Sequence, residues 1–137
     1  MERSVSRAGL LAYLVGAGVA GTLLVVPYTG RSVVVFLSPA YAPLVHVHFF
    51  LLPIAWGLWN WLRVRLRPRL AIGPWGALLG FVLAVLVNLL LAAEGRWFAG
   101  AMLLPVALPF VYGAVWGFLV GPLNHALGVE TYAMPSP

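Results

Sequence analysis

The sequence predicts an all-α integral membrane protein with four transmembrane helices. Of its 137 residues, 63% are hydrophobic and 8% are charged, whereas a soluble domain carries about 25% charged residues. Four apolar stretches contain no Asp, Glu, Lys or Arg: residues 8–26, 45–62, 75–93 and 99–120. Each has roughly the 20 residues that a helix needs to cross the hydrocarbon core. A lone strand of this kind would leave its backbone unpaired in lipid, so we expect helices in one compact bundle.

The first stretch follows Arg3 and Arg7 and could be read as a signal peptide. Its apolar run is longer than the roughly 7–15 residues typical of a signal peptide, and no cleavage site follows at once. We therefore expect a retained helix that ends at Pro27. On this reading, residues 1–137 form a single transmembrane domain, and residues 131–137 form a disordered tail.

The distribution of arginine predicts the orientation in the membrane. All of the basic residues except histidine are arginine, and four lie between the second and third stretches: Arg63, Arg65, Arg67 and Arg69. Two more precede the first stretch, while the two loops on the opposite side have one each, Arg31 and Arg96. The positive-inside rule then places both termini in the cytoplasm. The Lys-free composition hints at a bacterial or archaeal cytoplasmic membrane, and the quartet favours contact with anionic lipid headgroups over nucleic acid.

The loop over residues 31–44 is unusual because part of it is apolar. Residues 33–37 are Val-Val-Val-Phe-Leu, and they are followed by Pro39 and Pro43. This segment is too short to cross the bilayer. We expect it to lie along the outer headgroups, to form a re-entrant loop, or to pack beneath another subunit, because a bare apolar loop would be a liability in water.

The two halves of the chain admit an internal duplication. Pro53-x-x-Trp56-Gly57 in the second stretch recurs as Pro109-x-x-Tyr112-Gly113 in the fourth. Both halves begin on the same side of the membrane, so a duplication would give two parallel helical-hairpin repeats. Similar motifs also arise by chance in apolar sequences, and both interpretations stay open.

Rows of small residues at spacing four predict where the helices meet. Lipid is as apolar as leucine, so helices associate by close backbone approach at small residues and by a few hydrogen bonds. The first stretch has such a row at Ala8, Ala12, Gly16 and Ala20. The third and fourth stretches have theirs at Gly76, Gly80, Ala84, Asn88 and Ala92, and at Gly113, Gly117 and Gly121. We expect replacement of Gly117 by leucine to disturb the fold more than replacement of Val115.

Asn88 is the amide nearest the middle of a predicted span. An unpaired amide in lipid costs several kcal/mol, roughly, so Asn88 should face the bundle. It is expected to bond Thr22 or a backbone carbonyl freed by a proline, and its alternative role is a substrate or ion contact. Pro105 and Pro109 should kink the fourth helix. Asn60 is expected to cap contacts near the inner boundary.

His46, His48 and Glu94 are the candidate metal ligands, because imidazole and carboxylate groups bind zinc and other transition metals. The two histidines are two residues apart, so they converge only if the backbone there is extended. Anchoring at the membrane interface is the other interpretation of these histidines, with haem ligation or a proton relay as a further one. Glu94 could equally pair with Arg96 in the outer loop.

No nucleophile motif or phosphate-binding loop occurs in the sequence, and no Asp, Glu, Lys or Arg lies inside a span. These absences exclude cytoplasmic enzymatic work and favour a protein that is not an enzyme, and we expect no resident cofactor. The leading interpretation is a non-catalytic membrane subunit or scaffold that packs against itself or against other membrane proteins. The first alternative is an oligomeric facilitated transporter or channel for a small uncharged solute or an ion. The second is a metal- or haem-binding protein of the outer face.

Overall fold

The computed structural model of the chain describes residues 2–37, 42–66, 69–95 and 97–129, with side chains over 7–25, 51–66, 69–95 and 97–129. Every regular element in these ranges is a helix. The four longer helices are α1 (Glu2–Leu37), α2 (Ala42–Leu66), α3 (Ile72–Ala93) and α4 (Leu104–Val115). Three shorter elements belong to the last helical stretch: η2 (Ala99–Leu103), η3 (Trp116–Val120) and α5 (Gly121–Ala126).

Three helical segments are long and apolar enough to cross a membrane: Arg7–Val25, Ile72–Ala93 and Ala99–Ala126. They correspond to the first, third and fourth stretches of the sequence prediction. The described side chains of α2 cover only residues 51–66, which is shorter than the 18 residues that define such a segment. The protein therefore has the features of a helical membrane protein, and the fourth span and the orientation stay predictions.

The predicted loop over residues 31–44 is wrong for most of its length. The first helix does not stop at Pro27, because α1 continues to Leu37, and α2 begins at Ala42. A proline inside a helix removes one backbone hydrogen bond. In apolar surroundings a loop would leave many more backbone groups unpaired. Continuing the helix past the proline is therefore the less costly conformation.

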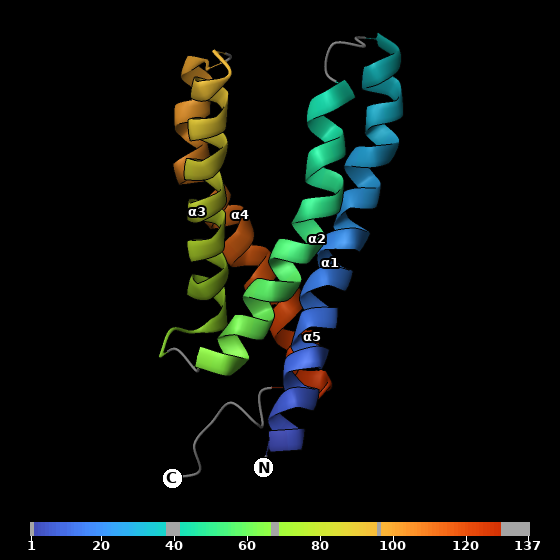
Figure 1. Ribbon diagram of the computed structural model, residues 1–137, viewed down its shortest axis with the longest axis vertical. Coiled ribbons are helices and arrows are strands. Elements are labelled where there is room, and N and C mark those ends of the chain that lie inside the picture. The colour runs from blue at the N-terminus through green and yellow to red at the C-terminus, as the bar shows by residue number, and fades with distance from the viewer. Residues whose placement is uncertain (1, 38–41, 67–68, 96, 130–137) are drawn as a thin grey trace. The chain divides into compact units, whose positions relative to one another are not determined.

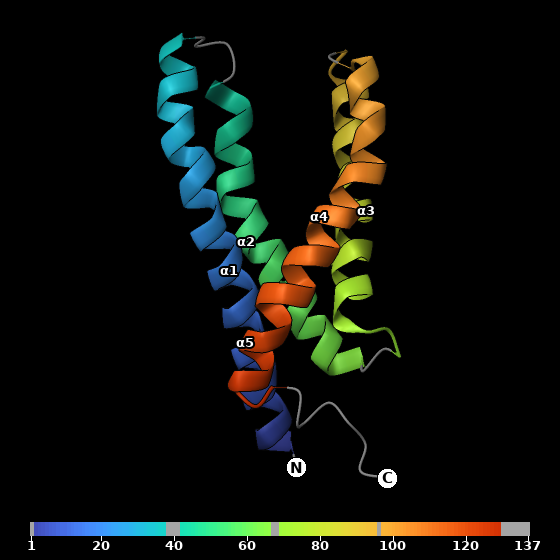
Figure 2. The ribbon, with the colours of Figure 1, turned by 180° about the vertical axis from the view of Figure 1, so that it is seen from behind.

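The chain divides into two compact units. Unit 1 comprises Met1–Arg67 and Asn124–Pro137, and unit 2 comprises Pro68–Leu123. Figure 1 shows α1 and α2 of unit 1 running side by side in opposite directions, and Figure 2 shows the same for α3 and α4 of unit 2. Each unit thus contains one helical hairpin. The single four-helix bundle and the duplication stay predictions.

In unit 1, small residues of α1 pack against large residues of α2. A Cβ added to Gly16 would lie 2.8 Å from the backbone carbon of Trp56 and 3.1 Å from Cβ of Asn60. In the reverse direction, a Cβ on Gly57 would lie 2.7 Å from the ring of Tyr13. The two backbones can approach this closely only because neither glycine has a side chain, which is how helices associate in lipid.

Unit 2 repeats this arrangement with different residues. A Cβ on Gly76 would lie 2.7 Å from Cδ1 of Trp116, and a Cβ on Gly80 would lie 2.9 Å from Cβ of Tyr112. Trp116 has 0% of its surface exposed, and Tyr112 has 8%. The small residues of α3 therefore accommodate the two aromatic side chains, which follow one another at spacing four along α4 and η3.

The helical stretch from Ala99 to Ala126 changes its type three times. It begins as a 3-10 helix, becomes α-helical at Leu104, widens to a π-turn over Trp116–Val120 and returns to an α-helix. Pro122 explains the π-turn, because proline has no N–H to bond the carbonyl four residues earlier. Instead, the N–H of Gly121 bonds the carbonyl of Trp116, five residues earlier.

Candidate functional site: two amide clusters between helices

The most deeply buried polar groups of the described residues are a pair of asparagines in unit 1. Asn60 has 0% and Asn124 has 1% of its surface exposed. Nδ2 of Asn60 donates to Oδ1 of Asn124 at 3.0 Å, and Nδ2 of Asn124 donates to Oδ1 of Asn60 at 3.0 Å. Nδ2 of Asn60 also donates to the carbonyl oxygen of Ala12 at 2.7 Å. Both amide hydrogens of Asn60 therefore have acceptors.

The position of Asn60 follows from the periodicity of α2. Trp56, Asn60 and Val64 recur at spacing four, all three are buried, and they share the face that packs on α1. Ala12 brings the backbone of α1 within reach, because a larger side chain would hold the two helices apart. Sequence reasoning placed Asn60 at the inner boundary and did not use Asn124. The recurrence of Trp56, Asn60 and Val64 at spacing four was the sequence signal that could have revealed this position.

The residues after α5 close onto unit 1 through a Schellman turn. Gly128 has φ of 69°, a left-handed conformation that glycine adopts without strain. Its N–H bonds the carbonyl of His125 at 3.0 Å, and the N–H of Val129 bonds the carbonyl of Asn124 at 2.8 Å. Val129 is thereby turned inward, with 2% of its surface exposed. It joins a buried cluster with residues of α1 and α2, namely Ala8, Ala12 and Val64.

A second amide cluster lies in unit 2, around Asn88. Its Nδ2 donates to the carbonyl of Ala84 at 3.0 Å and to the carbonyl of Ala101 at 2.9 Å. Nε1 of Trp97 donates to Oδ1 of Asn88 at 3.2 Å. Ala101 is four residues before Pro105, so its carbonyl is the one that the proline cannot bond. The N–H of Leu104 bonds this carbonyl instead, and Asn88 adds a second donor to it, so that both amide hydrogens of Asn88 are used.

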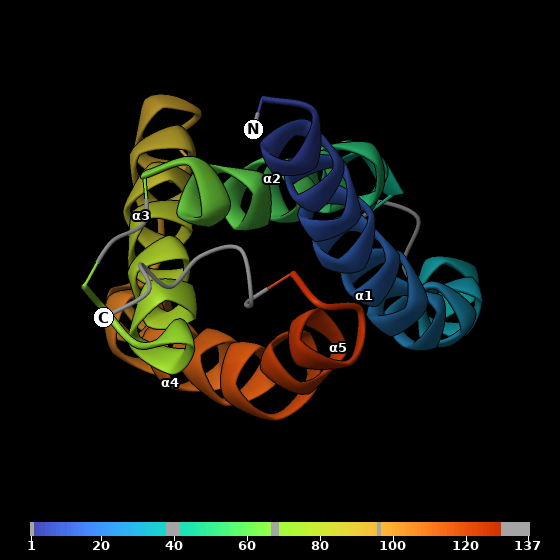
Figure 3. The same cartoon turned by 90° about the horizontal axis from the view of Figure 1, so that it is seen from below.

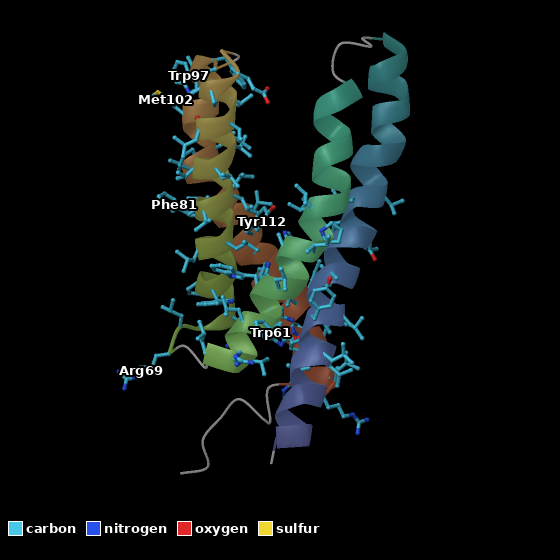
Figure 4. All side chains as sticks on the ribbon, viewed as in Figure 1. Trp61, Arg69, Phe81, Trp97, Met102 and Tyr112 are labelled. Atoms are coloured by element: carbon cyan, nitrogen blue, oxygen red, sulfur yellow. The ribbon has the colours of Figure 1, made fainter. Side chains whose placement is uncertain are left out.

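Figure 4 shows Trp97 at the end of unit 2 where α3 finishes and the last helical stretch begins, with Met102 at the same end. Phe81 projects outward from α3, and 47% of its surface is exposed. Phe81 and Met102 are thus turned outward, whereas Tyr112 and Trp116 are buried between the helices of the same unit.

The candidate metal ligands are only partly described. His46 and His48 lie within the bounds of α2, but their side chains are outside the described residues. Glu94 caps the end of α3 and is exposed. No group of three His, Cys, Asp or Glu residues that could hold a metal occurs among the side chains that are described. The metal site stays a prediction.

The arginine quartet is divided between a helix and a linker. Arg63 and Arg65 lie in the last turn of α2, and the guanidinium carbon of Arg65 is 5.3 Å from the ring centroid of Trp61, a cation–π distance. Arg69 is exposed before α3 (Figure 4). Arg67 is outside the described residues. Their expected roles in topology and lipid contact stay predictions.

The predicted row of glycines in the last helical stretch is used only in part. A Cβ on Gly113 would lie 3.4 Å from Cβ of Ala77, and one on Gly121 would lie 3.1 Å from Cγ2 of Ile72. At Gly117, no heavy atom of the described chain lies within 4 Å of the position that a Cβ would take. The expected packing contact at Gly117 is therefore not made within the described residues.

The chain matches no protein-family model, no curated protein and no solved structure. Its function is therefore argued from the two amide clusters and the helix faces. The arrangement joins helices. Asn60 and Asn88 each donate to a backbone carbonyl of a neighbouring segment, and the glycine contacts allow close approach of two backbones. In the described part of the chain, these amides and glycines make their contacts with other residues of the same unit.

Proposed function

We propose that the protein is a non-catalytic membrane subunit or scaffold, which packs against further copies of itself or against other membrane proteins. The observation that carries this proposal is how the described polar side chains are used. The amide clusters around Asn60 and Asn88 donate to carbonyl groups of the same unit. Large apolar side chains are turned outward, with 76% of Phe110 and 80% of Phe118 exposed. The described residues thus offer apolar surfaces for packing against other helices.

The exposed face of α1 supports self-association. A Cβ on Gly18 or Gly21 would meet no heavy atom of the described residues within 4 Å. The Thr22 hydroxyl donates to the carbonyl of Gly18 at 2.8 Å, so its polar group is satisfied within its own helix. A helix face of this kind allows another helix to approach closely. We assign the protein to a bacterial or archaeal cytoplasmic membrane, with the arginines on the inner side beside anionic headgroups.

Dilution of the labelled protein in liposomes tests this proposal. Energy transfer between donor- and acceptor-labelled copies should persist on lipid dilution and should give a fixed stoichiometry. Gly18→Leu places a large side chain on the free face of α1 and should reduce the transfer. Leu10→Ile changes an exposed residue of the same helix, 59% exposed, and is the matched control. If energy transfer falls with lipid dilution in every variant, as it does between randomly distributed copies, self-association is contradicted. A gentle-detergent pull-down would then test for a different membrane partner.

The irregular last helical stretch favours a second candidate, a facilitated pathway for a small uncharged solute or an ion. Discontinuous helices form binding sites in many transporters, and π-turns occur frequently at functional sites. The 3-10 segment Ala99–Leu103 and the π-turn Trp116–Val120 are such discontinuities. Flux into proteoliposomes that disappears with Asn88→Leu would support this candidate. A leak equal to that of protein-free liposomes would exclude it for the solutes tested.

A further inference from the structure

The segment Asn124–Val129 belongs by its contacts to unit 1, although the chain that leads into it belongs to unit 2. The change of unit occurs within α5, between Leu123 and Asn124. Figures 1 and 3 show the end of α5 beside α1. The segment is therefore an addition to the first hairpin that arrives from the far end of the sequence.

Recognition between this segment and the hairpin is specific. The Asn60 and Asn124 side chains exchange two hydrogen bonds of 3.0 Å in a place where neither is exposed by more than 1%. Leaving a buried amide without a partner costs about 1–3 kcal/mol. A displacement of Asn124 by one position along α5 would lose both bonds and leave the Asn124 amide without a partner, whereas Asn60 would keep its bond to the carbonyl oxygen of Ala12. The pair therefore sets the register of the segment as well as holding it in place.

The segment lies at the end of the last helical stretch. Its helix α5 has 6 residues and follows the π-turn Trp116–Val120 directly, and fraying helix ends open at the lowest free-energy cost. The first hairpin does not depend on it in the same way, because Gly16 contacts Trp56 and Gly57 contacts Tyr13 without its participation. Local opening is expected first in the element with the fewest supporting contacts.

We propose that Asn124–Val129 is a strap that closes on the first hairpin as one unit, is locked by the Asn60–Asn124 pair, and opens while the hairpin stays folded. Closure inserts Val129 among Ala8, Ala12 and Val64 through the Schellman turn at Gly128. Opening removes Asn124 from the Asn60 amide, which keeps its bond to the carbonyl oxygen of Ala12, and uncovers the apolar residues that Val129 covers.

A cysteine reporter tests the strap, because the chain has no cysteine of its own. Val129→Cys places a thiol at the buried end of the strap, and Leu127→Cys places one on the same segment at a residue that is 50% exposed. With a membrane-permeant maleimide, the thiol at 127 should react at least about tenfold faster than the thiol at 129. That ratio corresponds to about 1.4 kcal/mol of protection.

Adding Asn60→Leu should accelerate labelling at 129 about tenfold and leave labelling at 127 unchanged. Asn124→Leu should do the same, whereas Asn88→Leu, which removes the amide of the other cluster, should have no effect at 129. A thiol introduced by Val15→Cys, at a residue of α1 that is 7% exposed, should stay protected throughout.

Three results overturn the proposal. If the thiols at 127 and 129 react equally fast in the otherwise unchanged chain, or if Asn60→Leu leaves the rate at 129 as it was, the amide pair does not lock a strap. If the thiol at 15 becomes reactive together with the thiol at 129, the segment opens only when the hairpin unfolds. A test of self-association is separate from these measurements and does not alter their outcome.

Discussion

Alanine substitution at Gly76 and Gly117 should have opposite effects on the stability of unit 2. At Gly76 the new Cβ would lie 2.7 Å from Cδ1 of Trp116, a distance that real Cβ contacts essentially never show. Trp116 has no exposed surface into which it can move. At Gly117, which is one residue after that tryptophan, the new methyl group would meet no heavy atom of the described residues within 4 Å.

These distances set the expected magnitudes. Overpacking a close-packed interior costs about 1–3 kcal/mol, and occasionally more. Replacing glycine by alanine stabilises a helix by roughly 0.8–1 kcal/mol, and this gain applies at both positions. Because the new Cβ at Gly76 would meet three atoms of Trp116 closer than 3.0 Å, the upper part of the first range applies, about 2–3 kcal/mol, and Gly76→Ala should destabilise unit 2 by about 1–2 kcal/mol net. Gly117→Ala should be neutral or should stabilise it by up to about 1 kcal/mol.

Reversible unfolding of the purified protein in mixed micelles measures the difference. Tryptophan fluorescence is a suitable signal because Trp116 is itself the buried side chain in question. Gly73→Ala is an intermediate case, since its Cβ would lie 3.4 Å from the carbonyl oxygen of Gly113, and its effect should lie between the other two. Equal stability of Gly76→Ala and the unchanged protein, or a greater loss for Gly117→Ala, would refute the packing described for α3 against η3.

Asn88→Leu should destabilise unit 2 by about 0.6–2 kcal/mol, because the carbonyl of Ala101 and the indole N–H of Trp97 each lose a hydrogen bond to the Asn88 amide, and unfolding in mixed micelles should show the loss. Gly128→Ala should make closure of the segment Asn124–Val129 less favourable by about 1–2 kcal/mol, because φ of 69° is strained for alanine. Faster hydrogen exchange of the backbone after α5 should report this change. Reporter domains fused after Arg31 and after Arg67 should lie on opposite sides of the membrane, and a common location would contradict the predicted orientation.

The sequence was sufficient for the helical character of the protein and for the residue types that join its helices. Composition alone excluded a soluble domain, and the row with Gly76 and Gly80 falls on the face of α3 that packs on aromatic side chains. Gly117 shows the limit of such rows. A spacing of four drifts by about 40° per step around a 3.6-residue helix, and the π-turn that follows Val115 changes the register further. Neither the drift nor the change of register can be predicted from the spacing of small residues alone.

The amide pair of unit 1 could not be predicted for a different reason. Asn60 and Asn124 are separated by 64 residues, and periodicity describes which face a residue occupies but not which distant segment reaches it. Pro27 misled the prediction because proline ends helices in water, where a freed carbonyl can bind solvent. In apolar surroundings the remaining backbone bonds favour continuation of the helix.

The length of α1 has a consequence for what the first hairpin presents outside the lipid. At about 1.5 Å per residue, its 36 residues extend for about 54 Å, whereas the hydrocarbon layer is about 30 Å thick. Tilting absorbs part of this excess, and the remainder must project into the aqueous phase. By contrast, the 22 residues of α3 extend for about 33 Å and match the layer. α1 and α3 thus differ in length by about 21 Å, so α1 has helical surface beyond the hydrocarbon layer that α3 lacks.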